Sequence, residues 1–198
     1  MNKYNLRKLS IVLLAVCLSG CAVWTYIGEK SVPWKSGRFK AELPAGWMRF
    51  ASPQHQLFLT RDGSFLDSIA ITKSKTNTEF PNTKRKITED MLLQEIATLV
   101  VDEFSLDQAY KNFTVLSNQP SKIGGVDCFK LEYTFNNDRF VKYKGIIYGF
   151  VLERRYYQVE FVATQQHYYD SAIKDFEIFV SSFMIDTQNK NTKGGQHD

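Results

Sequence analysis

The sequence is poor in cysteine, with three cysteines among 198 residues. Cys17 and Cys21 lie in an apolar segment near the N-terminus, and Cys128 stands alone further along the chain. A disulfide-stabilised scaffold needs several thiols in the same domain, so that class of protein is excluded. If Cys17 and Cys21 lie outside the folded domain, the core must stabilise the fold without a disulfide.

Motifs for covalent, phosphate or metal chemistry are also missing. The sequence has no Gly-x-Ser-x-Gly, and no Ser-x-x-Lys accompanied by its partner motifs. Gly124-Gly125 lacks the flanking residues of a phosphate-binding loop, and Asp62 and Asp67 lack the spacing of a calcium loop. No two of the three histidines have metal-ligand spacing. We therefore expect no enzyme, no cofactor and no metal.

Cys128 is the one thiol that a folded domain could use. Its sequence neighbours are Asp127 and Phe129, and neither would lower the pKa of a thiol. We expect an inert cysteine within a strand.

After its first 20 residues, the chain has almost no excess of charge of one sign. The formal net charge is +4, but three of the 25 basic residues, Lys3, Arg7 and Lys8, lie in residues 1–20, which contain no acid. The remaining 22 basic and 21 acidic residues give a net charge of +1. Nucleic-acid binding usually requires a basic stripe, so it is not expected here.

Hydrophobic and aromatic residues, in contrast, are plentiful. They make up 43% and 14% of the 198 residues, with 15 Phe and 10 Tyr. This length and composition predict one globular domain with a well-filled core, and the aromatic content favours strands.

The N-terminal segment has the three parts of a secretion signal. Residues 1–10 are basic, Ile11 to Leu18 are apolar, and two small residues follow. The sequence Leu18-Ser19-Gly20-Cys21 resembles the bacterial lipobox. That resemblance implies a diacylglycerol on the Cys21 thiol, removal of residues 1–20 as a signal peptide, and acylation of the new N-terminus. Two or more acyl chains give a stable membrane anchor where one does not.

The residue after Cys21 bears on the destination. It is Ala22, whereas Asp at this position resembles the inner-membrane retention signal of enteric bacteria. The resemblance therefore favours the periplasmic face of the outer membrane over the inner membrane. An alternative stays open, because Ser10 to Gly28 contains no charged residue and approaches the length of a membrane-spanning helix. Both interpretations place the domain outside the cytoplasmic membrane.

The rest of the chain divides into three parts. Residues 21–36 are expected to form a membrane-proximal tether, 37–186 the folded domain, and 187–198 a polar, disordered tail. Alternating patterns within the domain predict strands, and the predicted ranges are 39–43, 56–61, 68–73, 113–116, 126–135, 140–148 and 156–163.

Two helices are expected between and after these strands. Thr88 would cap the first, since Glu89 and Asp90 follow it and apolar residues then recur at helical spacing from Leu92 to Phe104. Thr164 would cap the second, whose apolar stripe runs to Phe183. The order predicts an α+β domain: a mostly antiparallel, twisted sheet of about six to seven strands packed with two main helices.

Two short motifs carry a family resemblance. Phe39-x-x-x-Leu43-Pro44-x-Gly46-Trp47 and Val180-Ser181-Ser182-Phe183 resemble the PsbP/Mog-like fold and the DcrB-type bacterial lipoproteins. Members of this fold include photosystem accessory subunits, a Ran-binding protein and envelope proteins. The resemblance implies a sandwich and work in binding or assembly. In the chain itself, Trp47 and Phe183 are expected to be core residues.

A polar sheet face is the first candidate interaction surface. In the strand 126–135, apolar and polar side chains alternate, and the two later strands repeat the alternation. We expect both helices to cover one apolar face, or the second face to be only partly covered. The polar face would carry Lys130, Glu132, Lys142, Lys144 and Glu160. Alternatively, it is a solvated sheet with cross-strand ion pairs.

The basic segment from Lys73 to Lys86 is a second candidate surface. Its last three residues are Lys84, Arg85 and Lys86, which would suit an anionic lipid or an acidic partner. The sequence therefore favours a membrane-anchored envelope lipoprotein that binds or assembles proteins without catalysis. The alternatives are a carrier of an apolar ligand, which would need a large apolar pocket, and a hydrolase, which would need a convergent polar cleft.

Overall fold

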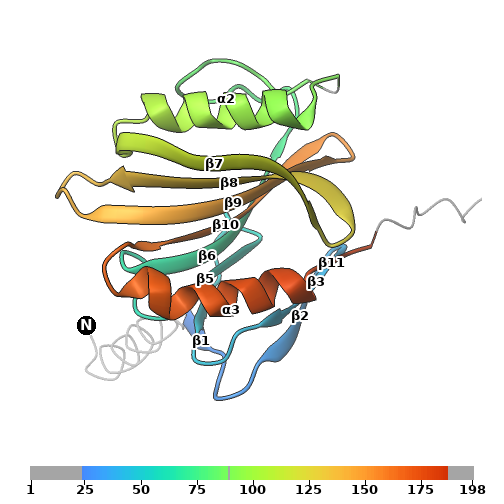
Figure 1. The fold of residues 1–198 in the computed structure, drawn as a ribbon. Helices are drawn as coiled ribbons and strands as arrows, with labels where there is room; N and C mark the ends of the chain where they lie inside the picture. Colours follow the sequence, from blue (N-terminus) through green and yellow to red (C-terminus); the bar gives the residue numbers. More distant parts are fainter. Residues whose placement is uncertain (1–23, 89, 187–198) are drawn as a thin grey trace, which may run out of the picture.

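The computed structural model describes residues 24–88 and 90–186, which form two sheets and two helices (Figure 1). The larger sheet is antiparallel, with the spatial order β1 (Trp24–Tyr26), β4 (Met48–Phe50), β5 (Leu57–Thr60), β6 (Asp67–Lys75), β10 (Arg155–Thr164), β9 (Lys142–Leu152), β8 (Val126–Asn136) and β7 (Lys111–Ile123). The smaller one has the order β11 (Met184–Ile185), β3 (Phe39–Leu43) and β2 (Val32–Ser36). The helices are α2 (Leu93–Leu106) and α3 (Tyr168–Ser182).

This architecture confirms the predicted α+β class, with two helices on a large antiparallel sheet. The folded part is longer than expected, however. Strands β1 and β2 lie in the stretch assigned to a tether, and they pair with β4 and β3. The domain therefore extends to Trp24. The predicted signal peptide, Cys21 and the predicted C-terminal tail lie outside the described residues.

Helix α2 begins four residues later than the Thr88 cap predicted. Its N-cap is Leu92, whose backbone N–H donates to Glu95 Oε2 at 2.7 Å. Ile87, just before the predicted cap, is instead buried in the core under α2. Strand β6 in turn extends to Lys75, because it pairs with β10 along its whole length. The basic segment is therefore shorter than expected and is tied down at both ends.

The two helices lie on opposite sides of the large sheet. Neighbouring residues of β8 show this, because Cys128 belongs to one core cluster and Phe129 to the other. The first cluster includes Phe176 and Phe179 of α3, and the second includes Leu99 of α2. We call these the α3 side and the α2 side of the sheet. The prediction that both helices cover one face is wrong.

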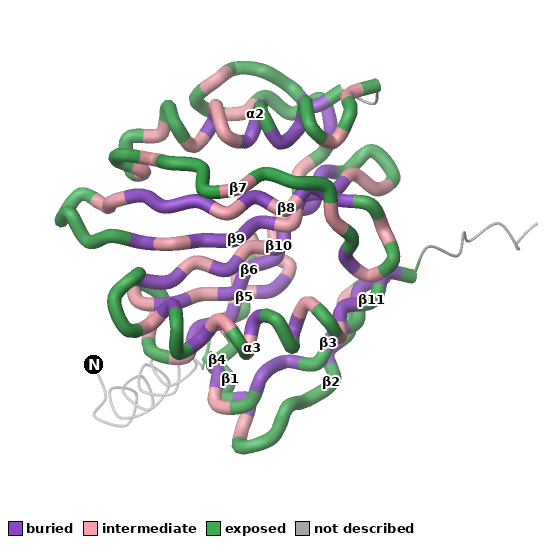
Figure 2. Tube along the Cα trace, in the orientation of Figure 1, coloured by how far each residue is buried: buried purple, intermediate pink, exposed green. Residues whose placement is uncertain are grey.

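Each side of the sheet is covered over only part of its width. Helix α2 packs on β7 and β8, whereas α3 packs on β10, β6 and β3 (Figure 1). The alternative expectation, a partly covered face, is therefore confirmed, and it holds for both sides. In Figure 2, buried and half-buried residues are mixed along β8 to β5. The central strand β9 is buried on both sides, since Ile146 lies in the cluster under α3 and Ile147 in the cluster under α2.

The interior between α3 and the sheet is filled with rings. Phe39, Phe150, Phe161, Phe176 and Phe179 are all almost completely buried there. Trp47 and Phe183 are core residues, as predicted. In the described part of the chain, neither helix is long and apolar enough to cross a bilayer.

Candidate interaction surfaces

The predicted charged strip on β8 and β9 lies on the α3 side, at the margin of the area that α3 covers. Lys130 Nζ lies 2.8 Å from Glu132 Oε1, and Lys144 Nζ lies 4.4 Å from the centre of the Tyr169 ring. Burial alone would lower the pKa of Lys130, but the hydrogen bond to Glu132 and nearby negative charge outweigh it and raise the pKa. Lys130 and Glu132 thus pair along one strand rather than across strands, and such a pair contributes little to stability. Lys142 is exposed at the start of β9.

The basic segment before α2 is also internally paired. Arg85 lies 3.1 Å from Asp102, and Lys86 lies 3.3 Å from Glu79. The Glu103 carboxylate of α2 accepts backbone N–H groups of Asn82 and Thr83 at 2.9 and 2.8 Å. Burial opposes ionisation of Glu103, but these hydrogen bonds dominate and lower its pKa. The segment is thus held against α2 by hydrogen bonds. Of its last three basic residues, Arg85 and Lys86 already form ion pairs.

Glu160 does not join the charged strip. It lies on β10 opposite Ala70, and its neighbour Val162 packs against the core under α2. The prediction that Glu160 shares a face with Lys130 and Glu132 is therefore wrong. In β10 the apolar residues face α3, whereas in β8 they face α2, so the polar residues of the two strands point in opposite directions.

On its own side, Glu160 is the centre of a hydrogen-bonded cluster. Tyr133 of β8 reaches across β9 and donates its hydroxyl to Glu160 Oε1 at 2.5 Å. It can do so because Gly145 lies beneath its ring, where a Cβ would come within 2.4 Å of a ring carbon. Gln158 also hydrogen-bonds Glu160 and accepts the Tyr156 hydroxyl at 3.1 Å.

The electrostatics of this cluster are unusual. Burial raises the pKa of Glu160 and outweighs the two hydrogen bonds that favour its charged form. Burial also raises the pKa of Tyr133 and Tyr156, and the charge on Glu160 adds to it. Among residues 24–88 and 90–186, no ion pair involves Glu160. A half-buried carboxylate without a cation is a candidate for a functional role.

The surroundings of Glu160 form the uncovered part of the α2 side. The strands β10, β6 and β5 turn small, polar or aromatic side chains to this side, and those that are half-buried include Phe58, Ser68, Thr72 and Gln158. None of these positions belongs to the core under α2. We call the surface made by these four residues and Glu160 the open face.

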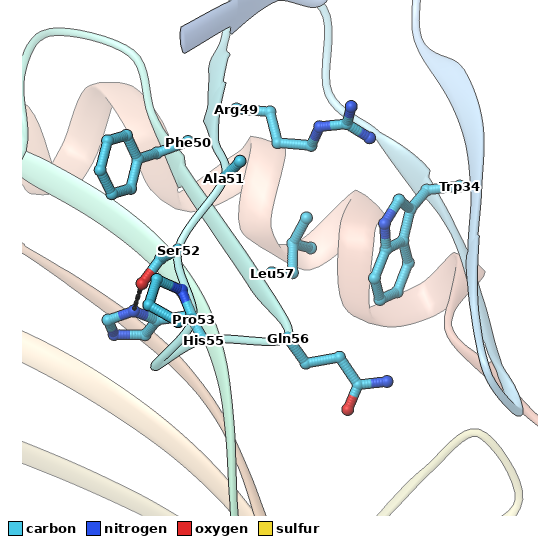
Figure 3. Close-up of a pocket in the computed structure, with 9 residues that line it drawn as sticks. All are labelled: Trp34, Arg49, Phe50, Ala51, Ser52, Pro53, His55, Gln56 and Leu57. Carbon is cyan, nitrogen blue, oxygen red and sulfur yellow. Dashed lines mark hydrogen bonds between the residues drawn. The ribbon is translucent and has the colours of Figure 1, made fainter. Parts of the chain in front are cut away.

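A small pocket lies at the connection between β4 and β5 (Figure 3). It has a volume of about 400 Å³. Leu57 lies at its centre, with Arg49 and Trp34 on one side and His55 and Ser52 on the other. His55 Nδ1 lies 3.0 Å from Ser52 Oγ, and burial lowers the pKa of the imidazole. The pocket is open to solvent and mixes polar and apolar side chains, so it lacks the apolar enclosure that a lipid carrier needs.

The residues weighed for chemistry have structural positions. Cys128 is completely buried, and burial raises the pKa of its thiol to about 11. Asp67 is buried as well, and it accepts Thr60 Oγ1 and the Arg61 N–H at 2.9 and 2.8 Å, which fixes the β5–β6 loop. Across the described ranges, no group of three or more His, Cys, Asp or Glu is placed to hold a metal.

Sequence reasoning selected Glu160 but missed its partners. Nothing in the pattern links Tyr133 to Glu160, which lies 27 residues later. The one available signal was Gly145, because a glycine inside a strand often marks the close approach of another group.

Comparisons with known proteins identify the fold. No protein-family model matches the chain, and no curated protein matches it by sequence. Solved structures do match: PsbP (CyanoP) from Synechocystis sp. PCC 6803 has a TM-score of 0.57 at 12% identity, and the match covers 80% of this chain and 94% of that one. The fold is that of PsbP and Mog1.

Two further matches support this assignment. LpqN of Mycobacterium tuberculosis, described as involved in cell envelope biogenesis, has a TM-score of 0.54 at 11% identity, with 82% of this chain and 88% of that chain covered. The Ran-binding protein Mog1p of Saccharomyces cerevisiae has a TM-score of 0.53 at 10% identity, with 79% and 94% covered. At such low identity, the PsbP/Mog1-like fold is what these likenesses show.

Proposed function

We propose that the chain is an envelope lipoprotein, anchored through Cys21 at the periplasmic face of the outer membrane, that binds a protein partner without catalysis. The observation that carries the binding part is the unpaired Glu160 carboxylate on the open face. The descriptions of Mog1p as Ran-binding and of LpqN as involved in envelope biogenesis are consistent with binding work on this fold. The lipobox-like Leu18-Ser19-Gly20-Cys21 supports the anchor.

The chemistry of the open face indicates the kind of partner. Glu160 is costly to ionise inside its cluster, because burial removes water and no cation replaces it. A Lys or Arg side chain of a partner would supply that cation and complete the network with Tyr133 and Gln158. A charge pair that is desolvated on binding contributes to specificity as well as affinity. We therefore expect a partner with a protruding basic residue.

The partner is tested by photo-crosslinking in cells. A photoreactive residue at Thr72 would report on the open face, and one at Gln119, which lies opposite Lys130, would report on the α3 side. We expect a crosslinked protein from Thr72, and we expect Glu160→Gln to reduce its yield at least threefold. The matched control Glu132→Gln should leave the yield unchanged. A crosslinked protein from Gln119 and none from Thr72 would contradict the proposal that the partner binds the open face.

The anchor is tested separately at Cys21. Replacing Cys21 with Ser removes the thiol that would carry diacylglycerol, so labelling with radioactive palmitate and cleavage after Gly20 should both be lost. Electrophoretic mobility and density-gradient separation of the membranes give the readout. A variant that is processed and sorted like the wild type would show that the apolar segment acts as an uncleaved anchor.

A further inference from the structure

Exposed aromatic side chains gather at one end of the domain. In the described residues, four aromatic side chains are more than a third exposed, and they are Trp24, Tyr26, Phe65 and Phe140. Phe65 and Phe140 are 83% and 75% exposed. We call these four residues, together with Met48 and Val141, the aromatic rim; both aliphatic side chains are exposed as well.

The rim is continuous across the ends of several strands. Trp24, Met48 and Phe65 line one shallow hollow, and Tyr26 pairs with Met48 across β1 and β4. A second hollow joins Leu66 to Phe140 and Val141. In Figure 1, the β5–β6 turn, the β8–β9 hairpin and the first turn of α3 all lie at the left end of the domain. The rim therefore forms one surface rather than scattered positions.

The loop that carries Phe65 is held firmly in place. Asp67 fixes its base, and the Arg61 guanidinium reaches Ser171 of α3, with 2.7 Å between Nη2 and Oγ. The Tyr143 hydroxyl donates to the Phe65 carbonyl at 2.7 Å. These contacts fix the backbone and leave the ring in solvent. An apolar ring on a fixed loop is suited to contact another surface.

The hairpin with Phe140 is built in the same way. Asn137 Oδ1 accepts the backbone N–H groups of Arg139 and Val141 at 2.9 and 3.0 Å. Phe140 has a φ of 58°, which is uncommon for a large side chain and places it at the tip. Basic residues flank the ring: the Lys111 Nζ lies 5.8 Å from its centre, and Arg139 precedes it.

The chain itself indicates what the rim meets. Cys21 precedes Trp24 by three residues, which can span at most about 11 Å when fully extended. A lipid on Cys21 would therefore keep Trp24, and the rim with it, close to the bilayer surface. Trp and Tyr flanked by Lys and Arg are the side chains that favour the headgroup region of a membrane.

We propose that the aromatic rim inserts into the headgroup region of the phospholipid bilayer and holds the domain in one orientation on the membrane. This inference rests on the lipid anchor of the proposed function, and it adds a second attachment. One covalent anchor alone does not determine which way the domain faces. Insertion at Phe65 and Phe140 as well would fix the direction of the open face relative to the membrane.

Tryptophan fluorescence tests the insertion on the full lipidated protein. Trp24 is 39% exposed, whereas Trp34 and Trp47 are buried in the core, so quenching from the bilayer reports on Trp24. The protein is reconstituted in phosphatidylcholine and phosphatidylglycerol vesicles with or without brominated acyl chains. We expect brominated lipid to quench the fluorescence, and we expect Trp24→Phe to remove at least three quarters of that quenching.

A second variant separates the rim from the nearby anchor. Phe65→Ser combined with Phe140→Ser changes two exposed rings and should leave folding intact, as circular dichroism would verify. We expect it to reduce Trp24 quenching at least twofold. The matched control is Ile178→Ser, which replaces an exposed apolar side chain on α3. This control should quench like the wild type.

The outcomes distinguish the rim from the anchor. Two results would contradict insertion of the aromatic rim while leaving the lipid anchor supported. In both, the protein floats with the vesicles. In the first, no quenching depends on Trp24; in the second, the Phe65→Ser, Phe140→Ser variant is quenched as much as the wild type. Protein that fails to float would overturn the anchor and, with it, the insertion. Flotation with quenching that falls in the double variant supports the proposal.

Discussion

The strands β8 and β10 have the same alternating pattern, but they turn their apolar side chains in opposite directions. Phe129 and Leu131 of β8 lie under α2, whereas Val159 and Phe161 of β10 lie under α3. The pairing through β9 fixes this relation, because Phe129 pairs with Gly149 and Gly149 pairs with Gln158. Alternation within a strand thus identifies a strand with one covered side, but the pairing decides which side that is.

This difference explains where the open surfaces lie. Each helix covers the half of the sheet whose apolar residues face it, and the polar residues of that half then face away from the helix. The α3 side is left with a self-paired strip at Lys130 and Glu132, and the α2 side is left with Glu160. On the α3 side Glu132 has a cation in Lys130, whereas on the α2 side no ion pair within the described residues involves Glu160.

The largest expected effects come from breaking the two cores one at a time. Phe176→Ala removes a buried ring under α3 that stacks on Phe161, and Leu99→Ala empties a buried site under α2. We expect the free energy of unfolding to fall by about 3–5 kcal/mol for the first and about 2–5 kcal/mol for the second. Urea denaturation measures both.

Combining Phe176→Ala with Leu99→Ala tests whether the two cores are energetically independent. The sheet separates the two clusters, so the losses should add within about 0.5 kcal/mol. A larger coupling free energy would mean that the two sides of the sheet form one cooperative core.

Much of the fold followed from the sequence because its signals are local. The alternation over 126–135 placed β8 within one residue of its observed bounds, Val126–Asn136. The apolar spacing likewise predicted both helices. The short strands β1 and β2 have little burial of their own and depend on β4 and β3, so no local signal marked them.

The site was less predictable because it depends on partners that are far apart in the sequence. Glu160 stood out as a polar residue in an alternating strand, but its side of the sheet depended on the pairing of β9. Tyr133, its hydrogen-bond donor, alternates like a core residue and is fully buried apart from that role. Only the assembled sheet brings the two together.

A smaller effect is expected from filling the space beneath a ring of β8. A Cβ at Gly149 would lie 2.1 Å from the Phe129 ring, so Gly149→Ala must displace that ring from the core under α2. We expect a loss of about 1–3 kcal/mol in stability, measured by thermal or urea unfolding. Adding Phe129→Leu should recover part of the loss, because the shorter side chain leaves room for the methyl group. A failure to recover would place the strain in the backbone instead.

The pH dependence should distinguish the open face from the charged strip. Burial raises the folded-state pKa of Glu160 above its unfolded value. The folded state therefore binds the proton more tightly, so this contribution to stability is present below the unfolded pKa and is lost as pH rises through the folded pKa. The Glu160→Gln variant should lose less stability than the wild type as pH rises. Its melting temperature at pH 7 should equal or exceed that of the wild type.

The smallest effect is expected on the α3 side, at Glu132. Its pair with Lys130 is partly exposed, at 25% and 22% of the side-chain surfaces, and exposed pairs contribute about 0.2–1 kcal/mol. Glu132→Gln should therefore lower stability by no more than this amount, and 0.5 M NaCl should weaken the difference because salt screens exposed charges. The sign is opposite to that expected for Glu160→Gln at neutral pH. If both variants destabilise the protein equally, Glu160 is as well satisfied as Glu132, and the open face offers no unpaired charge to a partner.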